Sequence, residues 1–82
     1  MIVEFAASAL TRIRSLEKED RRQIGHALHL LATEWKGDVK TLQNAGGERR
    51  LRTGDWRIRF VHDPPGTIFV LRVDRRDKAY RS

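Results

Sequence analysis

The chain has 82 residues, of which 34% are charged and none is cysteine, and its formal net charge at pH 7 is +6. This length supports one domain over residues 1–82, the lack of cysteine excludes disulfides and thiolate metal sites, and no apolar run is long enough to span a bilayer. Because the N-terminus carries no basic leader, we expect a soluble, cytoplasmic protein.

The first half of the chain predicts a short strand and two helices. Residues 1–5 (MIVEF) are rich in β-branched and aromatic side chains, which is typical of a strand. Residues 6–16 and residues 17–37 each repeat apolar side chains at helical spacing, and the second run forms one continuous apolar stripe. The pattern breaks near residues 15–18, so we expect a tight turn and a helical hairpin.

The second half predicts a loop followed by three strands. Residues 38–48 contain two adjacent glycines and few apolar side chains, which is typical of a loop. From there the apolar period changes to two in three runs, at residues 49–53, 55–62 and 67–74. The last two runs are separated by residues 63–66 (DPPG), which favour a turn.

This order of elements, β-α-α-β-β-β, predicts an α+β domain. The two helices must bury their apolar stripe against another surface, and the sheet is the only candidate that the sequence offers. Strands joined by short turns pair antiparallel. We therefore expect the helical hairpin to pack on one face of a small, largely antiparallel sheet.

Arginines alternate with apolar residues along residues 49–60 (RRLRTGDWRIRF). Successive side chains of a strand point to opposite faces of the sheet. We expect the apolar set to face the helices: Leu51, Trp56, Ile58 and Phe60. We expect the basic set on the uncovered face: Arg50, Arg52, Arg57 and Arg59. Such a face is either simply solvated or an anion-binding surface, because the nearby acids are too few to pair every arginine.

Positive charge is concentrated in the second half of the chain. Residues 1–40 contain 7 Lys/Arg and 6 Asp/Glu, whereas residues 41–82 contain 10 and 5, and nine of those ten are arginine. A guanidinium matches a phosphate or carboxylate through two parallel hydrogen bonds. The distribution predicts a polyanionic or acidic protein partner, although a GC-rich genome also favours arginine over lysine.

The order of elements, the string RLRTGDWRIRF and the ending VLRVDRRDKAYR resemble the RelE/ParE family of toxins from bacterial type II toxin–antitoxin systems. The resemblance implies a RelE-like fold over nearly the whole chain. In the RelE branch it implies a ribosome-dependent, metal-independent endoribonuclease that cuts mRNA, inhibits translation and needs no cofactor. A ParE-like inhibitor of DNA gyrase and a nontoxic, degenerate member are the alternatives, because one fold can carry different activities.

The resemblance also implies site residues. Arg57 matches an arginine that contacts the scissile phosphate, and Arg50 falls where the family has a basic catalytic residue. Arg76 matches an arginine that stabilises or protonates the leaving group, and Tyr80 matches a tyrosine that stacks on or orients the substrate nucleotide. The remaining cations are expected to bind RNA: Arg49, Arg52, Arg59, Arg75, Lys78 and Arg81.

This sequence departs from the family pattern at two positions. Arg75 stands where the family often has histidine, and Asp74 stands where it usually has glycine. A histidine general base is therefore missing, and arginine, with a pKa above about 12, is a poor base at neutral pH. Glu48 is the nearest carboxylate in the sequence for that part, so the pattern explains phosphate binding better than proton transfer.

Histidine and aromatic side chains have alternative interpretations. His26 and His29 are three residues apart on the long predicted helix. They are either a metal-binding pair or surface histidines, and the second interpretation is favoured because no third ligand is near in the sequence. Trp35 and Trp56 are interpreted as core or helix-end packing rather than as base-stacking platforms. Tyr80 either stacks on a base or covers the sheet edge.

The expected partners follow from the resemblance. Family toxins are neutralised by an acidic antitoxin that wraps around the toxin, so we expect a cognate antitoxin, the ribosome and mRNA as partners. Operator DNA is expected to contact the complex only through the antitoxin. We expect no metal, no cofactor and no membrane contact.

Overall fold

The computed structural model describes residues 1–42 and 46–75, which form five strands and two helices. In chain order these elements are β1 (Ile2–Phe5), α1 (Ala7–Arg14), α2 (Lys18–Glu34), β2 (Asp38–Thr41), β3 (Arg49–Thr53), β4 (Trp56–Asp63) and β5 (Thr67–Arg75). The predicted N-terminal strand, the helical hairpin and the three later strands are all confirmed. None of the helices in these residues is long and apolar enough to cross a membrane.

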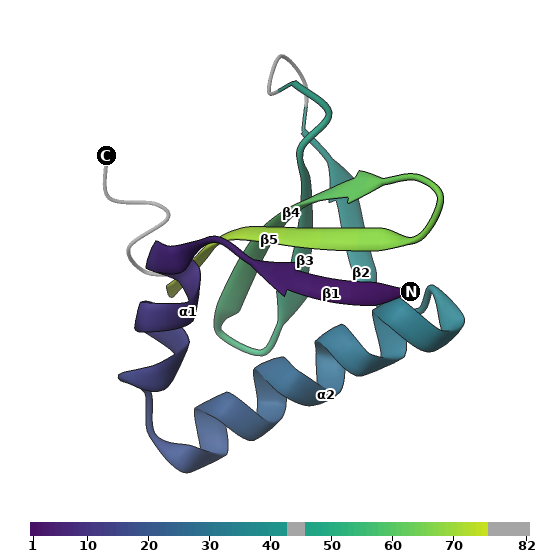
Figure 1. Cartoon of the computed structure of the whole chain (residues 1–82). Coiled ribbons are helices and arrows are strands. Elements are labelled where there is room, and N and C mark those ends of the chain that lie inside the picture. Colours follow the sequence, from purple (N-terminus) through teal and green to yellow (C-terminus); the bar gives the residue numbers. More distant parts are fainter. Residues whose placement is uncertain (43–45, 76–82) are drawn as a thin grey trace.

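The five strands form one mixed sheet in the order β1-β5-β4-β3-β2. The pair β1–β5 is parallel, and the other three pairs are antiparallel. Both helices lie on the same side of this sheet, as Figure 1 shows. The prediction of an α+β domain, with a helical hairpin on one face of a largely antiparallel sheet, is therefore confirmed.

The strand β2 corrects one sequence-based expectation. Residues 38–48 were expected to form a loop, but Asp38–Thr41 pairs antiparallel with Arg49–Thr53 as an edge strand. The run is only four residues long and offers the core one apolar side chain, Val39, which lies opposite Leu51. Backbone pairing with β3 holds this strand. Such pairing produces no alternation of apolar and polar residues, so the sequence pattern did not predict it.

The core lies between the helices and one face of the sheet. Helix α2 contributes the buried Ile24, Leu28 and Leu31, which recur at the spacing of one helical face. Helix α1 contributes Ala9. The strands contribute the remaining buried apolar side chains: Leu51, Trp56, Ile58, Phe60, Ile68, Val70 and Val73. All four apolar residues that alternation assigned to the helix side are among them, each at most 1% exposed.

The end of α2 is fixed by an unusual residue. The helix ends at Glu34, and its C-cap Trp35 adopts the left-handed conformation with φ of 53°. The Trp35 ring meets Phe60 edge-on at 6.4 Å between ring centroids and lies 5.2 Å from the His62 ring. These contacts anchor Trp35 at the helix end, although 41% of the residue stays exposed.

A β-bulge changes the side-chain alternation inside β5. Arg59 of β4 lies opposite Arg72, whereas the next residue, Phe60, lies opposite Val70, so Leu71 is the extra residue. Because of this extra residue, Val70 and Val73 both point into the core even though they are three positions apart. Arg72 and Asp74 consequently share the face of the sheet away from the helices.

Candidate nucleic-acid interface

The sheet face away from the helices carries two rows of charged side chains that run across four strands. Paired residues on neighbouring strands point to the same side. In the first, which we call the mixed row, the residues from β2 to β5 are Asp38, Arg52, Arg57 and Asp74. In the second, which we call the cationic row, they are Lys40, Arg50, Arg59 and Arg72. No element of the described residues covers this open face (Figure 1).

The mixed row is electrically balanced. Its two arginines are flanked by two carboxylates, and Arg52 Nε donates to Asp38 Oδ2 at 3.0 Å. Arg57 is the most enclosed charged side chain, with only 7% of the residue exposed. A guanidinium that is held by its surroundings needs little reorganisation when an anion arrives, which is the property that electrostatic catalysis requires.

The cationic row brings four positive side chains side by side. Like charges directly opposite each other on neighbouring strands are destabilising. Among the described residues, the carboxylate that reaches this row belongs to the mixed row: Asp74 Oδ2 lies 3.2 Å from Arg72 Nε. Arg50 Nε is shielded from solvent and has no hydrogen-bond partner among the described residues. The arrangement therefore has unmet capacity to bind an anion.

Two of the expected RNA-binding arginines lie on the opposite face of the sheet. Arg49 pairs with Phe60 and holds its guanidinium 5.5 Å from the centroid of the Trp35 ring. Arg75 pairs with Trp56, lies 4.9 Å from the centroid of that ring, and approaches Asp20 at 3.8 Å. The structure thus separates both arginines from the two rows.

The other expected site residues divide into two groups. Arg50, Arg52, Arg57 and Arg59 lie together on the open face, as the alternation predicted. Four further residues fall outside the described part of the chain: Arg76, Lys78, Tyr80 and Arg81. Glu48 is half-buried just before β3, and its backbone oxygen accepts from the Leu42 amide at 3.0 Å.

Lys40 and Arg72 are members of the cationic row that the sequence did not identify as site residues. Lys40 lay in the predicted loop, so no alternation assigned it to a face. Arg72 lay in an almost continuous apolar run. Because of the bulge at Leu71, simple alternation does not predict which face of the sheet its side chain occupies. The signal that would have found both is the pairing register, which local patterns do not contain.

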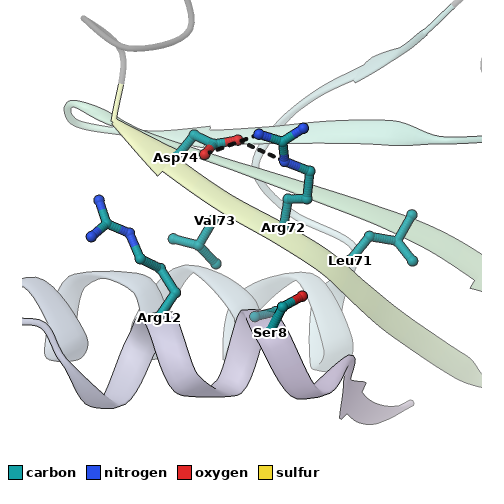
Figure 2. A pocket seen from close by; sticks show the side chains of 7 residues that line it. Ser8, Arg12, Leu71, Arg72, Val73 and Asp74 are labelled. Atoms are coloured by element: carbon teal, nitrogen blue, oxygen red, sulfur yellow. Dashed lines mark hydrogen bonds and ion pairs between the residues drawn. The ribbon is translucent and has the colours of Figure 1, made fainter.

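A shallow pocket of about 180 Å³ lies between α1 and the free side of β5. Strand β1 pairs with β5 only as far as Val70, so the rest of β5 has a strand neighbour on one side only within residues 1–42 and 46–75. The pocket is lined by Ser8, Ala9, Arg12, Leu71, Arg72, Val73 and Asp74. Figure 2 shows Arg72 and Asp74 rising together from β5, away from α1, while Val73 lies toward the helix.

The described residues contain no group of three His, Cys, Asp or Glu side chains that is arranged to hold a metal ion. His26 and His29 are both exposed on α2, and this helix lies on the other side of the sheet from the two rows. The chemistry available in the two rows therefore comes from guanidinium groups, one ammonium group and two carboxylates. Such a set can bind phosphate and stabilise negative charge that develops on it.

Comparison with known proteins agrees with this geometry at the level of the fold. No protein-family model matches the sequence, and no curated protein matches it. The structure matches a chain of the RelB-RelE antitoxin-toxin complex from Methanococcus jannaschii with a TM-score of 0.76 and 21% identity, over 95% of both chains. It matches the archaeal RelE-RelB complex from Pyrococcus horikoshii OT3 with a TM-score of 0.76 and 24% identity, over 92% of this chain and 93% of that one.

A bacterial structure agrees as well. The match to the toxin-antitoxin complex RelBE2 from Mycobacterium tuberculosis has a TM-score of 0.69 and 25% identity, over 92% of this chain and 96% of that one. The molecule is thus a small α+β domain that exposes a cationic sheet face. More specifically, it has the RelE-like fold that its sequence resemblance implied.

Proposed function

We propose that this chain is the toxin of a type II toxin–antitoxin system, and that it cleaves mRNA on the ribosome. The observation that carries the proposal is the gathering of four arginines on one open face, with Arg57 only 7% exposed. A solvated surface does not require an arginine to be enclosed in this way. The proposal makes the protein a cytoplasmic endoribonuclease that inhibits translation and needs neither metal nor cofactor.

In the proposed reaction the ribose 2′-oxygen attacks the adjacent phosphorus. A bond forms between these two atoms, the bond from phosphorus to the 5′-oxygen breaks, and the products are a 2′,3′-cyclic phosphate and a free 5′-hydroxyl. Arg57 and Arg50 would stabilise the charge that accumulates on the phosphoryl oxygens. A proton must leave the 2′-hydroxyl, and another must reach the 5′-oxygen, the role that the family resemblance gives to Arg76.

The proton acceptor in this proposal is Asp74. It is the carboxylate that the register places directly opposite Arg57, which the resemblance assigns to the scissile phosphate. Its side chain is 31% exposed, so a substrate hydroxyl can reach it. A general base must lie within reach of its proton. The position of Asp74 beside Arg57 supports it over Glu48, which lies just before β3, four positions from the Arg52 that pairs with Arg57. The ribosome would supply the orientation of the reacting groups, an effect worth several kcal/mol or more.

The proposed partner that controls this activity is an acidic antitoxin. The matched solved structures are complexes of RelE with RelB. An acidic segment that orders on the cationic face would gain charge complementarity and block access to Arg57. Operator DNA would contact the complex through the antitoxin. A reading frame for an acidic protein directly beside this gene would support the proposal.

The test is controlled expression of the wild-type chain in growing cells, followed by mapping of new mRNA 5′ ends. The expected result is growth arrest and cleavage within translated codons, with no cleavage of untranslated RNA. Arg57→Gln should abolish both effects, and Arg22→Gln on the exposed side of α2 is the matched control. Intact mRNA together with DNA breaks would instead identify a gyrase inhibitor, and normal growth would identify a nontoxic member.

A further inference from the structure

We infer that the cationic row is a phosphate-binding track, and that single-stranded RNA crosses the sheet along it from β2 to β5. The residues of this track are Lys40, Arg50, Arg59 and Arg72. The inference rests on the proposed function for the identity of the nucleic acid. It adds the path of the strand over the protein and two contact residues, Lys40 and Arg72.

The first argument is the unbroken sequence of charge along the row. Each of the four strands β2 to β5 contributes one cation, and successive members are direct register partners. Neighbouring strands lie about 4.8 Å apart, so the row extends over roughly 14 Å. That distance suits a chain of phosphates rather than one isolated anion.

The second argument is that this row destabilises the free protein. Three successive like-charge pairs stand opposite each other across the strands, and each such pair is unfavourable. Arg50 adds a shielded Nε without a partner among the described residues. A polyanion lying along the row would relieve the repulsion and supply the missing acceptor.

The third argument comes from the neighbouring mixed row. Arg52 already donates to Asp38 at 3.0 Å, so its charge is compensated before any ligand arrives. Arg72 also contacts a carboxylate, Asp74, but 62% of the Arg72 side chain is exposed, against 45% of the Arg52 side chain. The mixed row has one carboxylate for each arginine, whereas the cationic row has four cations and no carboxylate of its own, so the net positive charge lies along the cationic row.

A single strand of nucleic acid fits this surface better than a duplex does. The row lies on the face of a twisted sheet, and no helix of the described residues projects from that face to enter a groove (Figure 1). A flexible single strand can follow the row with its phosphates while its bases turn toward the mixed row. The scissile phosphate would then be the one that reaches Arg57, which lies two residues before Arg59 on β4 and one row away in space.

The test measures binding without cleavage. The full-length protein is titrated against a fluorescent single-stranded DNA oligonucleotide, which lacks the attacking 2′-hydroxyl, and against the same sequence with 2′-O-methyl ribose. Fluorescence anisotropy at several salt concentrations gives the slope of log affinity against log salt. For single strands this slope is about 0.7 per neutralised phosphate. Lys40→Gln, Arg59→Gln and Arg72→Gln should each reduce it by about 0.7.

Two variants of equal charge serve as controls. Arg21→Gln and Arg22→Gln each remove an exposed cation from α2, on the other side of the sheet. Both should leave the slope unchanged. Equal slopes for Arg72→Gln and Arg22→Gln, or no binding by the wild type, would overturn the inference. So would binding of polyglutamate with the same residue dependence in place of the oligonucleotides, because that result would assign the row to a protein partner.

The outcome is separable from that of the proposed function. Row-dependent binding without any mRNA cleavage in cells would reject the nuclease and retain the track. Cleavage in cells without row dependence would reject the track and retain the nuclease. Tighter binding of the 2′-O-methyl strand than of DNA would assign the track to RNA.

Discussion

Arg57 on β4 lies directly opposite Asp74 on β5, on the sheet face that the helices leave open. The pair joins the most enclosed cation of that face to a half-buried carboxylate at a position where the family pattern has glycine. Arg72 lies on the far side of the same carboxylate and forms an ion pair with it at 3.2 Å. One acidic side chain thus connects the mixed row to the cationic row.

Replacing Arg57 with lysine should reduce mRNA cleavage on the ribosome by about a hundredfold or more, the scale for losing one preorganised donor. Lysine keeps the charge but lacks the planar fork that contacts two phosphoryl oxygens. The measurement is primer-extension mapping of ribosome-bound mRNA with purified protein. Wild-type cleavage by Arg57→Lys would show that charge alone suffices at this position.

Replacing Asp74 with asparagine should change binding and turnover in opposite directions. The substitution releases Arg72 from its ion pair, so single-stranded RNA should bind more tightly and KM should fall. It also removes the proposed proton acceptor, so kcat should fall about a hundredfold or more, within the range typical of general base catalysis. Steady-state kinetics on ribosome-bound mRNA separates the two constants.

The comparison variant is Asp38→Asn, which removes the carboxylate at the other end of the mixed row. Its partner Arg52 lies on the β2 side of Arg57, away from Asp74. We expect tighter binding here as well, but an unchanged kcat. An equal fall of kcat in both variants would reject Asp74 as the acceptor.

Trp56 and Asp20 should be energetically coupled. The Trp56 indole N–H donates to Asp20 Oδ1 at 3.2 Å and connects the start of β4 to the first turn of α2. Hydrogen bonds to charged groups contribute about 1.5–3 kcal/mol. Urea unfolding of Trp56→Phe, Asp20→Asn and the double variant should therefore give a coupling free energy of about 1 kcal/mol or more. Strictly additive effects would mean that the contact contributes nothing to stability.

Two glycine-to-alanine substitutions should shift stability in opposite directions. At Gly37, where φ is 148°, a Cβ would lie 2.7 Å from Leu51 Cδ1, so alanine should reduce the free energy of unfolding by roughly 1–3 kcal/mol. At Gly25, inside α2, a Cβ meets nothing within 4 Å, so alanine should raise it by about 0.5–1 kcal/mol. Thermal and urea unfolding of both variants measure the two shifts, and a destabilised Gly25→Ala would contradict the packing described for α2.

The sequence predicted the fold where its apolar periods are long. The stripe of α2 and the strict alternation along β3 and β4 each point to one buried face, and the structure has both faces as expected. It missed β2 because a four-residue edge strand with one apolar side chain leaves no period to read. Strand existence there depends on the partner β3, which is several residues further along the chain.

The candidate site was only partly predictable for the same reason. Alternation placed Arg50, Arg52, Arg57 and Arg59 together, because all four lie in regular strands. Alternation also indicates that Arg49 faces the helices, because Arg49 lies two positions before the buried Leu51. The assembly of the two rows could not be predicted, because it depends on the register between strands and on the β-bulge at Leu71, which reverses the side-chain alternation of β5.

That irregularity, the extra residue Leu71, acts as a phase shift within β5. Before Leu71 the even-numbered residues of β5 point into the core, and after it they point to the open face. The strand can therefore supply apolar side chains to the core and charged ones to the open face. Without this bulge, strict alternation along the same residues would turn Arg72 and Asp74 inward and Val73 outward. Deletion of Leu71 would instead give a regular strand that keeps Arg72, Val73 and Asp74 on their present faces. The bulge in this strand therefore decides whether Arg72 and Asp74 join the charged face that β2, β3 and β4 already form.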